Sequence, residues 1–128
     1  MVASKADQLV LGIVIRNDIP DMTPGRAIAQ GSHATSEFHA ELSTEAYREW
    51  ADDGYFGTAL VFSGNERQLL DIIASSHKTG TTMHGITKDR SYKVETDGDI
   101  QYVPMITALW IFGPRKDVSR VCKKVQLF

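Results

Sequence analysis

The sequence is poor in cysteine and has no long run of apolar residues. Only one of its 128 residues is a cysteine, Cys122, so an internal disulfide is excluded and a reducing compartment fits best. No apolar stretch reaches the roughly 18 residues that a membrane-spanning helix requires. The first residues are too polar for a secretory signal peptide. We therefore expect a cytoplasmic protein with no membrane association.

Repeats, low-complexity tracts and linkers are also missing, which favours one domain over residues 1–128. The net charge of −2 does not by itself indicate a nucleic-acid partner. The charges are unevenly distributed, because residues 78–128 hold 9 basic and 5 acidic side chains whereas residues 1–77 hold 5 and 11. Basic residues within 78–93 and 115–124 are therefore candidates for phosphate-holding patches, and ordinary solvated faces are the alternative.

Apolar segments alternate with helical patterns along the chain. The expected strands are 8–16, 58–62, 81–87 and 105–112, and the expected helices are 24–42, 44–50, 65–74 and 114–121. A hairpin is expected at residues 93–102, turning at Asp97 and Gly98. This order predicts an α/β fold with a mostly parallel or mixed sheet covered on both faces. Ligands of such sheets usually bind at loops beyond the strand ends, next to helix N-termini.

The first candidate site lies where the first strand leads into the first helix. Thr23 and Pro24 suit the N-terminus of a helix, whose free N–H groups, together with Arg26, favour a phosphate or a developing oxyanion. Arg26, Gln30, His33 and Glu37 recur at helical spacing and share one stripe. An exposed face is the alternative for the stripe. His33 is suited to general base catalysis, or alternatively to a hydrogen bond with a neighbouring loop.

The second candidate site is the segment 88–92, which follows the third expected strand. It offers a carboxylate, two cations, a hydroxyl and the ring of Tyr92, a mixture that can hold phosphate and stack on a base. An ordinary charged loop is the alternative.

Motifs for metal binding and for common cofactors are missing. The four histidines show no spacing typical of a zinc site, and one cysteine supplies no zinc ligand set. There is no nucleophile elbow, no phosphate-binding loop and no dinucleotide fingerprint. We therefore predict neither a metal nor another cofactor.

The first strand and helix resemble a known family. Arg16-Asn-Asp-Ile19, Met22 and Gly25-Arg-Ala-Ile-Ala-Gln-Gly-Ser-His-Ala34 are similar to the opening of type II peptidyl-tRNA hydrolases. That family has Arg-x-Asp-Leu, then Met, then Gly-Lys-x-Ala-Ala-Gln-x-x-His-Ala. Later segments fit in the same order, including Ala59–Phe62 and the ending Lys123–Phe128, so the resemblance covers nearly the whole chain.

The resemblance implies a three-layer α/β/α sandwich on a four-stranded mixed sheet, here with the hairpin inserted before the last strand. It implies hydrolysis of the ester that joins a peptide to the 3′ end of tRNA, without metal or cofactor. The acceptor end of tRNA would be the partner, and a homodimer is an option. The residues predicted as catalytic are Arg26, His33 and Asp89, and those predicted to bind tRNA are Gly25, Gln30, Lys88, Arg90 and Ser91.

The sequence departs from the family pattern at two places. Arg26 stands where the family has lysine; arginine keeps the charge but does not release a proton at working pH. The family's Asp-Ala-Gly loop after the third strand is replaced by a longer segment at 88–103, in which Asp89 falls one place late. A catalytically inactive module that binds tRNA or protein on the same fold is therefore the alternative function.

Overall fold

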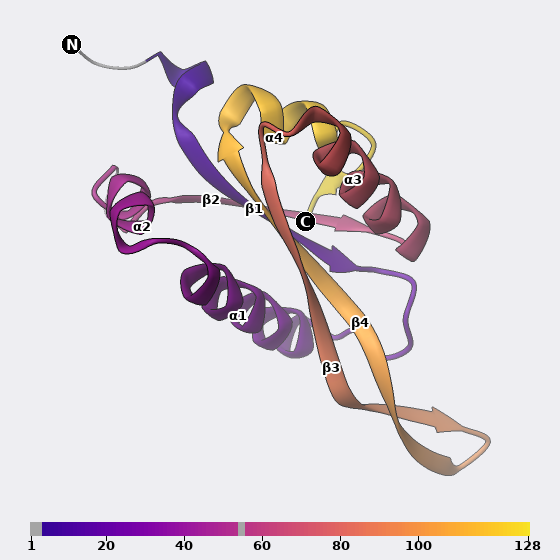
Figure 1. The fold of residues 1–128 in the computed structure, drawn as a ribbon. Helices are drawn as coiled ribbons and strands as arrows, with labels where there is room; N and C mark the ends of the chain where they lie inside the picture. The colour runs from indigo at the N-terminus through magenta and orange to yellow at the C-terminus, as the bar shows by residue number, and fades with distance from the viewer. Residues whose placement is uncertain (1–3, 54–55) are drawn as a thin grey trace.

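One open sheet runs through the computed structural model, which describes residues 4–53 and 56–128. The strands are β1 (Leu9–Arg16), β2 (Thr58–Gly64), β3 (Met83–Thr96), β4 (Asp99–Pro114) and β5 (Gln126–Leu127). Their order is β3-β4-β1-β2-β5, and β1 pairs in parallel with β2 and antiparallel with β4 (Figure 1). The predicted α/β class and mixed sheet are confirmed. The predicted count of four strands is wrong, because the end of the chain adds β5 beside β2.

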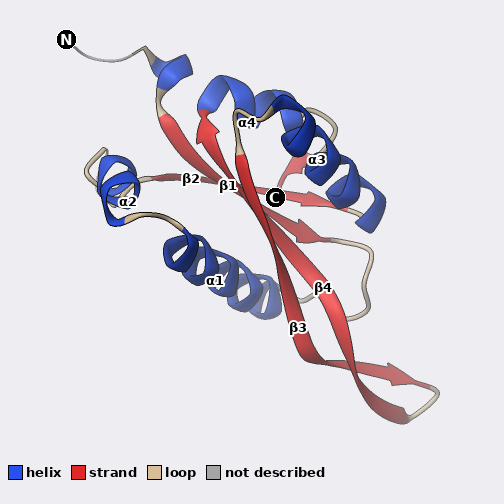
Figure 2. Ribbon diagram, in the orientation of Figure 1, coloured by secondary structure: helices blue, strands red, loops and turns tan. Residues whose placement is uncertain are grey.

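Helices cover both faces of the sheet. They are α1 (Pro24–Glu41), α2 (Thr44–Ala51), α3 (Glu66–Thr79) and α4 (Arg115–Val121), after a short 3-10 helix, η1 (Lys5–Asp7). Helices α1 and α2 lie against one face, and α3 and α4 lie against the other (Figure 2). Among the described residues, no helix combines the length and the apolar character needed to cross a bilayer.

Strand β1 is apolar from Leu9 to Ile15, and both of its faces are buried. Successive side chains of a strand point to opposite faces. Leu11, Ile13 and Ile15 pack in the cluster with α1 and α2. Val10 and Val14 pack in the cluster with α3 and α4. Strand β1 is therefore fixed as the middle strand of the sheet, and the loop that follows it leads directly to the start of α1.

The start of α1 follows from its first residues. The side chain of Thr23 accepts a hydrogen bond from the backbone N–H of Arg26 at 3.3 Å, and Pro24 is the first helical residue. Ala27 and Ala34 are buried, so the helix lies close to the sheet, across β1, β4 and β3. Its predicted span, 24–42, exceeds the observed one by a single residue.

The segment after residue 87 differs from the prediction. Strand β3 does not end at Thr87 but continues to Thr96, turns at Asp97 and Gly98 with φ of 51° and 84°, and pairs with β4 on its return. The predicted hairpin at 93–102 and its turn are therefore confirmed, whereas the interpretation of 88–92 as a charged loop is wrong, because these residues continue β3. A run of charged residues is typical of a loop, but β3 is an edge strand, where charged side chains are also common.

Candidate active site

The centre of the candidate site is the side chain of Gln30, which is only 5% exposed. Its Nε2 donates a hydrogen bond to Oδ2 of Asp89 at 3.1 Å, and its Oε1 accepts one from the Thr107 hydroxyl at 2.6 Å. Asp89 also accepts a hydrogen bond from the backbone N–H of Ser91 at 2.9 Å. We call Gln30, Asp89 and Thr107 the Gln30 network. It joins α1 to the β3–β4 hairpin.

Two irregularities in the β3–β4 pairing build this network. At the first, β4 carries an extra residue, Thr107, opposite the step from residue 87 to 88. Neighbouring residues of a regular strand point to opposite faces. Here Thr107 bonds to Gln30 of α1, and its neighbour Ala108 packs in the core beneath the same helix. The second irregularity lies between residues 89 and 92, where the extra residue is in β3. Bulges of this kind re-aim side chains.

Arg26 lies one helical turn before Gln30 and is half-buried. Its guanidinium carbon is 5.2 Å from the ring centroid of Tyr92, in a cation–π contact. Its Nη1 atom is buried and has no hydrogen-bond partner within the protein. An unpaired buried donor costs roughly 1–3 kcal/mol, so such a group calls for an explanation. A bound anion or a polarised carbonyl oxygen could supply the missing partner only if the atoms that cover Nη1 move, because this atom is inaccessible to solvent.

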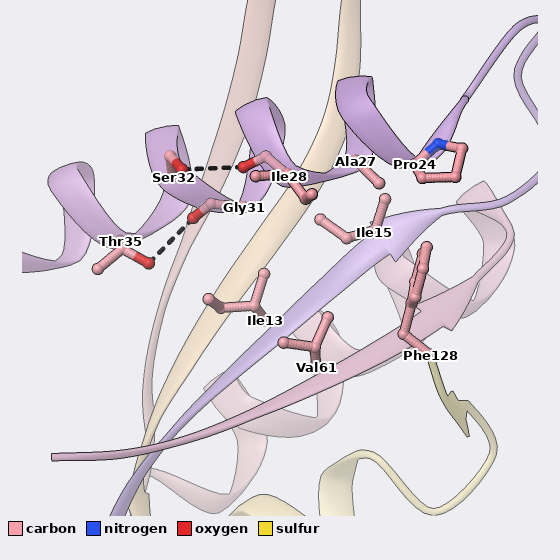
Figure 3. A pocket seen from close by; sticks show the side chains of 10 residues that line it. All are labelled: Ile13, Ile15, Pro24, Ala27, Ile28, Gly31, Ser32, Thr35, Val61 and Phe128. Atoms are coloured by element: carbon pink, nitrogen blue, oxygen red, sulfur yellow. Dashed lines mark hydrogen bonds between the residues drawn. The ribbon is translucent and has the colours of Figure 1, made fainter.

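A cavity lies on the other side of α1, between that helix and β1 and β2 (Figure 3). Its volume is about 640 Å³. Its walls are mostly apolar, and the hydroxyls of Ser32 and Thr35 bond to carbonyl groups of their own helix. The residues that line it are Ile13, Ile15, Pro24, Ala27, Ile28, Gly31, Ser32, Thr35, Val61 and Phe128. The Gln30 network is therefore not part of this cavity.

Comparison with protein families decides the assignment. Residues 9–128 match the family model described as peptidyl-tRNA hydrolase PTH2. The chain belongs to the PTH2 family. The resemblance drawn from the sequence is thereby confirmed, and the Gln30 network belongs to a PTH2 domain.

The PTH2 fold is also found in a solved structure. A protein of unknown function, Atu0240 from Agrobacterium tumefaciens strain C58, superposes with a TM-score of 0.60 and 14% sequence identity. The similarity covers 94% of this chain and 98% of that protein. At this identity it supports the fold alone. A search of curated proteins found no match.

The residues predicted for the PTH2 site do not all come together. Gln30 and Asp89 are bonded to each other, and Arg26 lies on the same stripe of α1. His33 is exposed, and within the described part of the chain its side chain forms no hydrogen bond. Gly25 is exposed, and a Cβ atom added at this glycine would have no neighbouring atom within 4 Å, so the helix start is open.

The segment 88–92 also differs in part from its prediction. Lys88, Arg90 and Ser91 are exposed on β3. Tyr92 is only 2% exposed, so the expectation that its ring stacks on a base is wrong. Thr107 was not predicted at all, since regular alternation along β4 would point it away from α1.

The two predicted basic patches differ in how their charges are balanced. Lys88 and Arg90 flank Asp89 along β3 and are exposed. Three members of the 115–124 patch contact side-chain oxygens: Arg115 lies 2.9 Å from Gln8, Lys116 lies 3.0 Å from Asp7, and Arg120 lies 3.8 Å from Asp117. The patch on β3 is therefore the better candidate for phosphate contacts.

Glu37 lies at the far end of the stripe that begins with Arg26. Burial raises the pKa of its carboxyl group, and the nearby Thr87 hydroxyl and His33 oppose that shift. The Thr87 hydroxyl is buried, and among the residues that the structure describes it has no hydrogen-bond partner, so its effect on Glu37 is one of proximity. Within residues 4–53 and 56–128, no group of three or more potential metal ligands is found.

Proposed function

We propose that this PTH2-family chain hydrolyses the ester bond of peptidyl-tRNA at the candidate site. The observation that carries the proposal is the unpartnered, buried Nη1 of Arg26 beside the Gln30 network. A cationic donor held ready at the start of a helix favours an anion or the oxyanion that forms during ester cleavage.

The roles of the residues follow from their hydrogen-bonding capacity. Arg26 would stabilise the negative charge that develops on the ester carbonyl oxygen. Each oxygen of the Asp89 carboxylate accepts one hydrogen bond and retains capacity for another. Asp89 can therefore accept a hydrogen bond from a water molecule and direct its oxygen at the ester carbon. The water oxygen bonds to the ester carbon and gives up a proton, the bond from that carbon to the 3′ oxygen of tRNA breaks, and the proton passes to the 3′ oxygen.

Residues around this centre would contact the tRNA. Gly25 leaves the helix start open to a phosphate, and Lys88, Arg90 and Ser91 are exposed on the adjoining stretch of β3. Lysine and arginine contacts to phosphates are weakened by salt because they act through counterion release. His33, exposed one turn beyond Gln30 on the same stripe, would contact the acceptor end.

Release of free tRNA from peptidyl-tRNA by the purified protein tests the proposal. Arg26→Ala should lower kcat/KM about 100-fold or more, which is typical for loss of one oxyanion donor. Arg67→Ala is the matched control, because Arg67 is an exposed arginine on α3, across the sheet. No cleavage by the wild-type protein, or equal rates for wild type and Arg26→Ala, would refute the assignment.

The alternative function is a tRNA- or protein-binding module without catalysis. The arginine at position 26 favours it, since arginine cannot act as a proton donor in place of the family's lysine. Salt-sensitive tRNA binding without cleavage by the wild-type protein would support this alternative. A gain of cleavage in Arg26→Lys would show that the arginine limits the reaction.

A further inference from the structure

We infer that Tyr92 is a positioning residue that holds Arg26 while leaving its N–H donors free for the substrate. This inference rests on the proposed function. Tyr92 stands in the segment where the sequence departs from the family pattern, and the pairing of its ring with Arg26 is a property of this chain.

Tyr92 joins three segments of the chain. Its hydroxyl donates a hydrogen bond to the carbonyl oxygen of Pro20 at 2.7 Å, in the loop between β1 and α1. Its ring faces the guanidinium of Arg26 in the first turn of α1. The residue itself lies in β3 and is only 2% exposed. The ring is therefore held at one end by the backbone of β3 and at the other by the hydrogen bond to Pro20, and Arg26 packs against it.

The irregularity in β3 places this ring beneath α1. Asp89 and Tyr92 are three residues apart, so regular alternation would point them to opposite faces of the sheet. The extra residue between them removes this difference. As a result Asp89 bonds to Gln30 of α1, and Tyr92 contacts Arg26 of the same helix.

An aromatic ring is suited to holding Arg26 because it attracts the face of the guanidinium. The N–H donors lie in the plane of the guanidinium, and the ring does not accept hydrogen bonds from them. A carboxylate in the same place would occupy those donors. The buried Nη1 of Arg26 is in fact unpartnered. Tyr92 thus accounts for a half-buried cation that is held in place and still has a donor to offer.

Two readouts test the inference, one of them independent of activity. In NMR spectra, the ring current of Tyr92 should shift the side-chain signals of Arg26; Tyr92→Phe should keep this shift and Tyr92→Leu should remove it. An Arg26 spectrum that is the same in wild type and Tyr92→Leu would overturn the inference. This measurement retains its meaning even if the wild-type protein proves inactive, an outcome that would refute the proposed function alone.

The second readout is the rate of peptidyl-tRNA cleavage in a double-mutant cycle. Loss of the cation–π contact should lower kcat/KM about 5- to 30-fold in Tyr92→Leu, whereas Tyr92→Phe should restore most of the rate. In the Arg26→Ala background, Tyr92→Leu should have no further effect. If Tyr92→Leu lowers the rate equally in both backgrounds, the role is merely structural and the inference fails. The inference also fails if Arg26→Ala lowers kcat/KM but Tyr92→Leu changes it in neither the wild-type nor the Arg26→Ala background.

Discussion

Replacing Gln30 by glutamate tests whether the Gln30 network exists in solution. The change puts a carboxyl oxygen where the amide nitrogen now lies 3.1 Å from Oδ2 of Asp89. Two unit charges at that distance repel by about 5 kcal/mol at an effective dielectric constant of about 20. The introduced carboxyl group should therefore keep its proton to higher pH in the folded protein than in the unfolded one. Its pKa is raised on folding.

The sign of the pH dependence follows. Below the unfolded value of about 4.3 the introduced group is protonated in both states and adds no electrostatic penalty. As pH rises above that value, the free energy of unfolding should fall by at most about 1.4 kcal/mol per pH unit, or about 2.7 kcal/mol between pH 5 and pH 7. The fall ends once the introduced group also ionises in the folded protein.

Gln30→Met is the matched control, because it removes both hydrogen bonds without adding a titratable group. It should cost about 2–4 kcal/mol, the sum of one charge-assisted and one neutral hydrogen bond, with no change in that cost between pH 5 and pH 7. Urea unfolding followed by the fluorescence of the buried Trp50 and Trp110 measures both variants. If the cost of Gln30→Glu does not rise with pH, Asp89 does not lie beside residue 30 and the site is wrong.

Two further predictions concern groups outside the Gln30 network. Burial raises the pKa of the Cys122 thiol to about 12. A thiol reagent at pH 8 should therefore leave the native protein unmodified and label the protein rapidly in urea. Rapid labelling without urea would contradict the burial of this thiol. Burial also raises the pKa of Glu37, so its charge lowers stability above about pH 4.3, the unfolded value. Glu37→Gln should therefore raise the thermal midpoint at pH 7 and have little effect at pH 4, and the opposite order would show that the carboxylate is stabilised.

Much of the fold could be predicted from local patterns. The continuous apolar run of β1, the cap formed by Thr23 and the turn at Asp97 and Gly98 depend on neighbouring residues only. The stripe that brings Arg26 and Gln30 onto one side of α1 follows from the helical period alone. These features were therefore accessible without knowledge of distant contacts.

The rest of the site depends on how two strands pair, which local patterns do not encode. Whether residue 88 begins a loop or continues β3 is decided by its partner in β4. The bulges that turn Thr107 and Tyr92 toward α1 interrupt the alternation on which strand prediction relies. Thr107 could not be found for that reason, and the sequence indicates Tyr92 as a site residue but suggests the wrong task for it.

The central claim is that the start of α1 and the bulged part of β3 form one active site. The most direct test is kcat/KM for peptidyl-tRNA cleavage in Arg26→Ala, Asp89→Asn and the double variant. Groups that act as a unit give non-additive losses, so we predict that the double variant is about as slow as the slower single variant. Losses that multiply, as they do for independent positions, would contradict the account.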